Sequence, residues 1–242
     1  MSTNRSLKKK DDTVSNPQNV SILRRAVNFL CRFKSFVHHS TGLLTWETKS
    51  YEIWLVLQNL LYLLKPKTLL EFGSGRSTNY LAEYALKFGA KFISIEEHFY
   101  YCLKVNLTLK LSFLPSGIVK YAPIKNGWYS LKKLNKVLPA LGPVDFLLVD
   151  GPTTVGNGQR ESSAFYEHIL PLLNDVKIIV IDDVHRPDPN KMADKLLQKF
   201  NLKRYDINYR EKNTLSILLN YESFQKIDEL PLCLRELLIH KN

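Results

Sequence analysis

The regular alternation of short apolar runs with helical patterns beyond Lys67 is the feature that most constrains this fold. The apolar runs of strand length are 67–72, 91–96, 118–122, 144–149, 176–182, 202–209 and 214–220. Helical patterns fill the segments between them, namely 76–88, about 97–113, 129–138, 161–173 and about 190–200. Strands that alternate with helices of 10–15 residues indicate βαβ units and a parallel sheet. No helix separates the last two runs, so they are expected to pair as an antiparallel hairpin. The sequence predicts an α/β, doubly wound, seven-stranded, mostly parallel sheet over residues 65–220.

The chain before this domain has two different parts. Residues 1–20 are polar and basic, and a disordered leader is expected there. Residues 21–64 are expected to hold N-terminal helices. Within them, 21–38 reads as an amphipathic helix with a basic and an aromatic face, either a docking helix or an interfacial membrane anchor. Residues 221–242, after the last strand, are expected to pack as a short C-terminal segment.

Composition and charge narrow the classes of protein. At 45% hydrophobic residues, the chain has enough apolar material for a sizeable core, which excludes general disorder. The formal net charge is +11, and residues 1–45 hold eight basic but only two acidic residues, so the folded part is only mildly basic. No apolar run is long enough to span a bilayer. Three distant cysteines form neither a disulfide framework nor a zinc motif. A cytoplasmic protein, peripheral to a membrane if it contacts one, is expected.

The most informative segment is LLEFGSGRSTNYLAEYA, residues 69–85. Gly73 and Gly75 allow a tight turn between strand and helix and a close approach of backbone to a ligand. A dinucleotide site requires a third glycine, where this chain has Thr78. Glu71, two residues before the first glycine, would repel a pyrophosphate. A carboxylate at this position instead suits a ligand that carries an ammonium or sulfonium charge.

A second carboxylate, Glu96, ends the next predicted strand, twenty-three residues after Gly73. A carboxylate there can accept hydrogen bonds from both ribose hydroxyls of a nucleoside. NAD and S-adenosylmethionine share this requirement, and Glu71 separates the two because it favours the cationic ligand.

The segments EFGSGRST, SIEE, LLVDGP and VIDDVHR, in this order and spacing, resemble those of class I S-adenosylmethionine-dependent methyltransferases, which have a Rossmann-like fold. The resemblance covers roughly residues 46–220. It implies S-adenosylmethionine as cofactor, with Glu96 at the ribose and with Ser77 and Thr78 near the methionine carboxylate. The remaining cofactor-binding residues that it implies are Glu71, Gly73, Ser74, Gly75 and Asp150.

The acceptor is expected beside the ends of the fourth and fifth predicted strands, at Asp150 and at Asp182–Asp183. The glycine-containing segment 151–163 between them is expected to form a flap over the site. A hydroxyl acceptor needs a base or a metal to remove its proton, and either Asp150 or His185 can be that base. Arg160 is the third expected catalytic residue. The expected substrate-binding residues are Arg160, Arg186 and Asp183.

Metal dependence is left open by the sequence. Asp150, Asp182 and Asp183 could hold a divalent cation through oxygen ligands. Small catechol-type O-methyltransferases carry a similar trio, but with an amide in the last place, where this chain has Asp183.

A narrower resemblance points to the acceptor. LLVDGP, GQRESSAFY and IDDVHR are loosely similar to the glucuronoxylan 4-O-methyltransferase group, which acts on an acidic sugar. Arg160 and Arg186 match the two arginines of that pattern, and guanidinium groups suit a carboxylate. Gly151 and Asp182 depart from the pattern. The expected activity is O-methylation of a hydroxylated small molecule or glycan that can carry a negative charge.

Three other functions remain. A nucleic-acid methyltransferase would use the basic N-terminal arm, but the base-methylating signatures N-P-P-Y and D-P-P-Y are absent after the fourth strand, which argues against nucleic acid as a partner. A non-catalytic membrane-associated protein of the same fold would contact the bilayer through 21–38. A nicotinamide dehydrogenase is disfavoured by Glu71 and Thr78. Fold alone does not decide among them.

Overall fold

The computed structural model describes residues 48–153, 159–208, 213–230, 235 and 239–241. The expected leader 1–20, the amphipathic helix 21–38 and the middle of the expected flap, 154–158, lie outside the described residues. Within the described part, no helix has the length and hydropathy needed to cross a bilayer.

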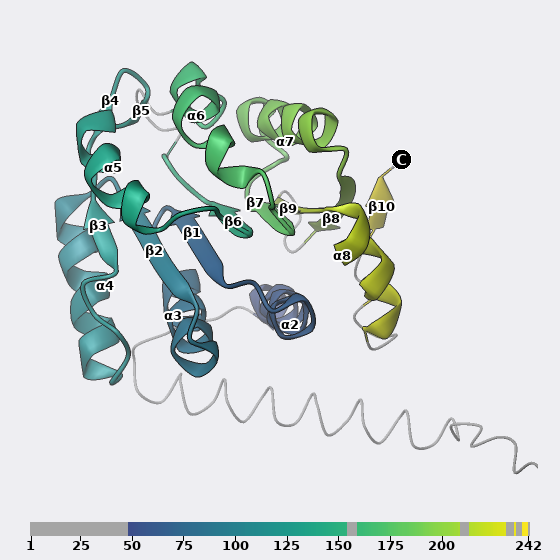
Figure 1. Cartoon of the computed structure of the whole chain (residues 1–242), viewed down its shortest axis with the longest axis horizontal. Coiled ribbons are helices and arrows are strands. Elements are labelled where there is room, and N and C mark those ends of the chain that lie inside the picture. The colour runs from purple at the N-terminus through teal and green to yellow at the C-terminus, as the bar shows by residue number, and fades with distance from the viewer. Residues whose placement is uncertain (1–47, 154–158, 209–212, 231–234, 236–238, 242) are drawn as a thin grey trace, which may run out of the picture. The chain divides into compact units, whose positions relative to one another are not determined.

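One eight-stranded sheet forms the centre of the domain, with strand order β10-β8-β9-β7-β6-β1-β2-β3 (Figure 1). Its strands are β1 (Thr68–Phe72), β2 (Lys91–Glu96), β3 (Val119–Tyr121), β6 (Phe146–Val149), β7 (Ile178–Ile181), β8 (Lys203–Asn208), β9 (Thr214–Leu219) and β10 (Ile239–Lys241). Five neighbouring strands are parallel, in the order β3, β2, β1, β6 and β7. Strands β9, β8 and β10 each pair antiparallel with their neighbours. The doubly wound sheet and its hairpin are therefore confirmed. Strand β10, in the segment after residue 220, extends the expected seven strands by one at the edge.

Helices cover both faces of the sheet (Figure 1). One face carries α2 (Thr48–Leu64), α3 (Arg76–Phe88), α4 (Phe99–Leu111) and α8 (Tyr221–Gln225), and the other carries α5 (Leu131–Val137), α6 (Ser163–His168) and α7 (Pro187–Phe200). Short 3₁₀ turns follow α5, α6 and α8 at Leu138–Ala140, Leu170–Leu173 and Lys226–Glu229. Because side chains alternate along a strand, Leu69 lies in one hydrophobic core and Leu70 in the other. Both faces of each central strand are buried, as a parallel sheet requires.

A small hairpin before α5 differs from the sequence prediction. The expected helix 129–138 begins only at Leu131, because Tyr129 belongs to β5 (Trp128–Tyr129), which pairs with β4 (Ile124–Lys125). Asn126 and Gly127 connect the two strands, and both have positive φ. An Asn-Gly pair with this conformation is the preferred two-residue hairpin turn. The signal was present in the sequence, but the Lys-rich helical pattern that follows it obscured the hairpin.

The strand order reverses between β1 and β6, and their carboxyl ends come very close together there. Gly73 has φ +90°, and a Cβ atom at this position would lie 2.8 Å from both the Asp150 carbonyl carbon and the Gly151 amide nitrogen. A Cβ atom on Gly151 would in turn lie 2.2 Å from the Tyr129 hydroxyl. Glycine is therefore required sterically where the two strands end. In doubly wound sheets, ligands bind at this switch point.

We expect Gly73→Ala to lower the free energy of unfolding by about 2–4 kcal/mol, because the new methyl group overlaps backbone and the residue must keep a left-handed φ. Gly75→Ala is the matched control: Gly75 has extended φ of −172° and open space around its Cβ position, so its stability should change by less than about 0.5 kcal/mol. Urea denaturation followed by circular dichroism measures both. Equal stabilities for the two variants would contradict the close approach.

Candidate functional site

Glu71, the penultimate residue of β1, is the most buried carboxylate of the site, with no exposed surface. Its Oε2 atom accepts a hydrogen bond of 2.7 Å from the Thr78 hydroxyl, and that hydroxyl accepts one of 2.9 Å from the Gly75 amide. Its Oε1 atom is buried without a hydrogen-bond partner. An unpaired buried carboxylate oxygen is costly, so this atom is suited to receive a donor from a ligand.

Burial raises the pKa of Glu71 from 4.5 to about 7, and repulsion from Glu96 adds to this shift. The nearby hydroxyls of Ser77, Ser94 and Thr78 lower the pKa and offset part of the effect. Near neutral pH, Glu71 is therefore divided between its neutral and its charged form. A cation that binds beside it would favour the charged form.

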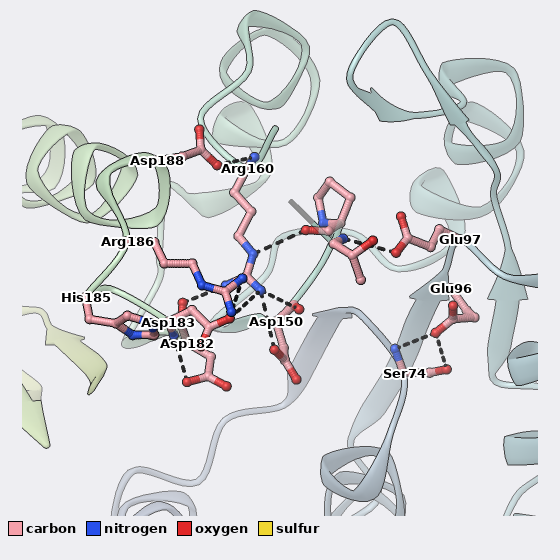
Figure 2. Close-up of polar contacts among 12 residues, drawn as sticks. Ser74, Glu96, Glu97, Asp150, Arg160, Asp182, Asp183, His185, Arg186 and Asp188 are labelled. Atoms are coloured by element: carbon pink, nitrogen blue, oxygen red, sulfur yellow. Dashed lines mark hydrogen bonds and ion pairs between the residues drawn. The ribbon is translucent and has the colours of Figure 1, made fainter. Parts of the chain in front are cut away.

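Glu96, at the end of β2, is held by the turn that follows β1 (Figure 2). Its Oε2 atom accepts hydrogen bonds from the Ser74 amide at 3.0 Å and from the Ser74 hydroxyl at 2.6 Å. Its Oε1 atom accepts a bond of 2.8 Å from the His98 amide. The turn and the β2 end are thereby fixed relative to each other, with Glu96 beside the glycine turn as expected.

Arg160 connects the ends of β6 and β7 through its guanidinium group (Figure 2). Its guanidinium donates to the carbonyl oxygens of Asp150 at 2.7 Å, Asp182 at 2.6 Å and Pro152 at 3.4 Å. It also lies 3.5 Å from the Asp150 carboxylate. Only 3% of its side chain is exposed. This geometry gives Arg160 a positioning role. Its expected contacts with an acceptor stay a prediction, since all three guanidinium nitrogens are engaged by the protein in this conformation.

Asp150 is the exposed carboxylate of the group. Nearly half of its side chain, 48%, faces solvent, although protein encloses the rest. This enclosure, repulsion from Asp182 and further repulsion from Asp183 and Glu71 raise the pKa of Asp150 well above its usual value, while Arg160 lowers it. A carboxylate with a raised pKa is a stronger base than an ordinary aspartate.

Asp183 connects the cations of the acceptor side (Figure 2). Its carboxylate lies 3.6 Å from Arg160, 3.3 Å from Arg186 and 4.0 Å from His185 Nδ1. His185 is partly exposed, and the Arg186 side chain is 44% exposed. The structure thus brings together all the residues expected at the acceptor side, and it places Arg186 rather than Arg160 toward solvent.

Three residues of this edge were not singled out from the sequence. Asp188, at the start of α7, accepts hydrogen bonds from the backbone amides of Arg160 and Glu161 at 2.7 and 3.1 Å. Glu97 accepts one of 3.0 Å from the Thr153 amide, and so holds the start of the expected flap. The Tyr129 hydroxyl is buried against Gly151. These three residues contact segments that are distant in the sequence, which a motif does not specify. Only Glu97, beside Glu96 in SIEE, lies in a segment that the sequence analysis singles out.

The expected cofactor contacts divide into two groups. Gly73, Ser74 and Gly75 form the turn and Glu96 lies beside it, while their contacts with a cofactor stay a prediction. Thr78 is fully buried and faces Glu71, so its hydroxyl positions that carboxylate, while the expected contact of Ser77 and Thr78 with a ligand carboxylate stays a prediction.

The Asp150, Asp182 and Asp183 trio does not fit a cation site in this structure. In the described part of the chain, no three His, Cys, Asp or Glu side chains are arranged to hold a metal ion. Arg160 instead lies between the Asp150 and Asp183 carboxylates. No step of a reaction is therefore assigned to a metal here.

Comparison with known proteins identifies the type of fold. No family model and no curated protein matches the sequence. Among solved structures, a protein assigned as a caffeoyl-CoA O-methyltransferase from Staphylococcus aureus is 12% identical, with a TM-score of 0.53 over 84% of this chain and 98% of that one. The fold is that of a Rossmann-like methyltransferase.

Two further solved structures have lower TM-scores. An O-methyltransferase from Bacillus cereus in complex with SAH is 15% identical, with a TM-score of 0.47 over 78% of this chain and 90% of that one. The N-terminal domain of human METTL16 in complex with SAH is 13% identical, with a TM-score of 0.47 over 74% and 72%. At these identities the likeness concerns the fold, and the narrower likeness to the glucuronoxylan group is not found among these structures.

The residues of the glycine turn fit S-adenosylmethionine, the cofactor of this methyltransferase fold. The buried Glu71 Oε1 atom accepts no hydrogen bond, so an ammonium group could donate one to it, and a nearby sulfonium would favour its charged form. A Cβ atom at Gly75 would have no neighbour within 4 Å, so the fold does not require glycine there sterically. The chain therefore has an unpaired acceptor and, at Gly75, a backbone position without close neighbours beside the same turn.

The raised pKa of Glu71 makes a prediction about stability. Because the folded-state pKa of about 7 exceeds the ordinary value of 4.5, the ligand-free folded protein binds more protons than the unfolded chain between these pH values. Its stability should therefore fall as pH rises from about 4.5 to 7, by at most about 3 kcal/mol from this group. Glu71→Gln should flatten that part of the curve, measured as the difference in urea unfolding between the two proteins from pH 4.5 to 8. Parallel curves would show that the pKa of Glu71 is not raised.

Proposed function

We propose that this chain is an S-adenosylmethionine-dependent methyltransferase that methylates a hydroxyl group of its acceptor. The observation that carries the proposal is the buried, unpaired Oε1 atom of Glu71 at the switch point of a methyltransferase fold. A neutral or anionic ligand would leave this carboxylate uncompensated, whereas a cationic one stabilises its charged form.

Two carboxylates have separate roles in the proposed binding of the cofactor. Glu71 accepts the ammonium group of the methionine moiety, and Thr78 holds Glu71 in place. Glu96, fixed by Ser74 and His98, accepts the ribose hydroxyls. S-adenosylmethionine supplies an electrophilic methyl group when it is bound. The protein aligns this group with the acceptor and excludes water from it.

We propose Asp150 as the base that removes the proton of the acceptor hydroxyl. This residue directly follows β6 and its backbone contacts Gly73, so it lies nearer to the cofactor turn than His185 does. Its pKa is raised above that of an ordinary aspartate, which makes its carboxylate a stronger base. Arg160 fixes the Asp150 backbone, and His185 remains the alternative base because Asp183 lies beside its Nδ1 atom.

The acceptor is proposed to be a hydroxylated small molecule or glycan with a negative charge. Arg186 supports the anionic part, because it combines a guanidinium fork with an exposed position at the mouth of the β7 end. Asp183 orients that guanidinium. The substrate class rests on this cation and on the resemblance of the surrounding motifs.

Isothermal titration calorimetry tests the cofactor before any acceptor is known. We expect the parent to bind S-adenosylmethionine and not NAD, and Glu71→Gln to bind it about tenfold or more weakly, because a charge-assisted hydrogen bond is lost. The affinity of the parent should increase from pH 6 to 8, relative to that of Glu71→Gln, as Glu71 ionises. Gly75→Val should abolish binding without unfolding the protein. If the parent binds neither S-adenosylmethionine nor S-adenosylhomocysteine, the proposed function is wrong.

Transfer of a labelled methyl group to glucuronate-containing oligosaccharides, neutral oligosaccharides and catechols tests the acceptor. We expect Asp150→Asn to lower kcat by about 100-fold or more while the Kd for S-adenosylmethionine stays within about threefold. Arg186→Gln should raise KM for the acidic acceptor more than for the neutral one.

Two results would contradict these assignments. A smaller loss in Asp150→Asn than in His185→Gln would assign the base to His185. Equal effects of Arg186→Gln on acidic and neutral acceptors would remove the anionic part of the proposal.

A further inference from the structure

Helix α4 has an apolar side that faces solvent. Tyr100, Leu103, Leu107 and Leu111 are between 53% and 70% exposed. Phe113, directly after the helix, is 93% exposed. Single exposed leucines are ordinary on a protein surface, but a contiguous row of large apolar side chains marks an interaction surface.

The row follows the helix geometry. Its members are spaced by three, four and four residues, so they form one stripe along α4. The opposite side of the helix is also apolar, because Cys102 and Leu109 are buried in the core beneath it. Figure 1 shows α4 as the outermost helix of its face, with α3 as its neighbour on the inner side. The described part of the fold therefore buries one side of α4 and leaves the stripe exposed on the other.

Two exposed lysines flank the stripe. At about 100° per residue, Lys104 and Lys110 lie about 60° to either side of its centre, which Leu107 marks. No acidic residue occurs in α4. Lysines at the two borders of an apolar stripe can extend their ammonium groups to an anionic layer while their methylene chains remain in apolar surroundings.

We infer that α4 lies in the plane of an anionic membrane surface, with the stripe in the boundary between headgroups and acyl chains. Charge complementarity favours this occupant over a second copy of the chain. A symmetric pairing of two α4 stripes would bring four lysines to one seam without an acidic partner from either helix. Anionic phosphates at both borders of the stripe satisfy the lysines and leave the leucines in apolar surroundings. This surface shares no residue with the proposed catalytic site.

Flotation of the full chain with vesicles of phosphatidylcholine alone, or with 30% phosphatidylserine added, tests the inference, where that fraction is a roughly physiological choice. We expect the parent to bind the anionic vesicles. Leu103→Glu/Leu107→Glu should reduce the partition coefficient about tenfold or more, since apolar burial is lost and negative charge is added. Lys104→Gln/Lys110→Gln should reduce it by about fivefold for each lysine on anionic vesicles only.

Tyr221→Glu is the matched control, because Tyr221 is also exposed, at 61%, but lies on α8. It should bind as the parent does, and thermal unfolding should show that all variants keep the fold. If the parent does not bind, or if the leucine variant loses no more than the control, the inference is wrong. A concentration-dependent dimer in sedimentation that the leucine variant abolishes, without vesicle binding by the parent, would assign the stripe to a second copy instead.

Discussion

The close approach of β1 to β6 at the switch point is the constraint on which the rest of the site depends. The two strands are parallel and paired in register up to Phe72 and Val149, so the residues that follow both strands meet at one edge of the sheet. Only glycine fits at positions 73 and 151, because a side chain on either would overlap backbone or the Tyr129 hydroxyl. Once this contact is made, Glu71, Glu96 and Asp150 belong to a single edge.

These three carboxylates differ in how the fold satisfies them. Glu96 accepts hydrogen bonds at both oxygens, so it is positioned before any ligand arrives. Glu71 is satisfied at one oxygen only. Asp150 is repelled by three other carboxylates, and Arg160 offsets part of that repulsion. An edge with this much negative charge and few exposed cations repels a pyrophosphate. The same arrangement stabilises a sulfonium or an ammonium, so the electrostatics and the fold favour the same class of cofactor.

Much of the fold could be predicted from the sequence, because apolar runs of five to seven residues that alternate with helical patterns indicate a parallel sheet. The β2 strand and the α3 helix have the predicted bounds, 91–96 and 76–88. The hairpin around Asn126 and Gly127 was missed because the helical pattern that follows overlaps its second strand. Strand β10 was missed because a three-residue edge strand has no periodicity to detect.

The residues singled out from the sequence lie near one another at one edge of the sheet, but their orientations were not predictable, and their roles stay a prediction. Thr78 and Glu71 were both singled out, yet their mutual hydrogen bond depends on the path of the turn, which a motif does not specify. Arg160 was expected to face an acceptor. Three carbonyl groups, from Asp150, Pro152 and Asp182, converge on it only after β6 and β7 are aligned, so its burial follows from tertiary structure. Charged side chains near strand ends can serve the fold or the ligand, and sequence spacing alone does not distinguish these two uses.

The position of α4 relates the proposed membrane surface to the site. Helices in a doubly wound sheet run antiparallel to the strands, so α4 begins at Phe99, three residues after Glu96, and runs away from the ligand-binding edge. If α4 lies in the membrane plane, its axis of about 20 Å is parallel to the bilayer, and the carboxyl edge of the sheet opens along the membrane rather than into it. Cofactor and acceptor can then reach the edge from the aqueous phase or from the headgroup layer. The proposed membrane stripe and the proposed cofactor turn share no residue, so each can be tested by substitutions that leave the other unchanged.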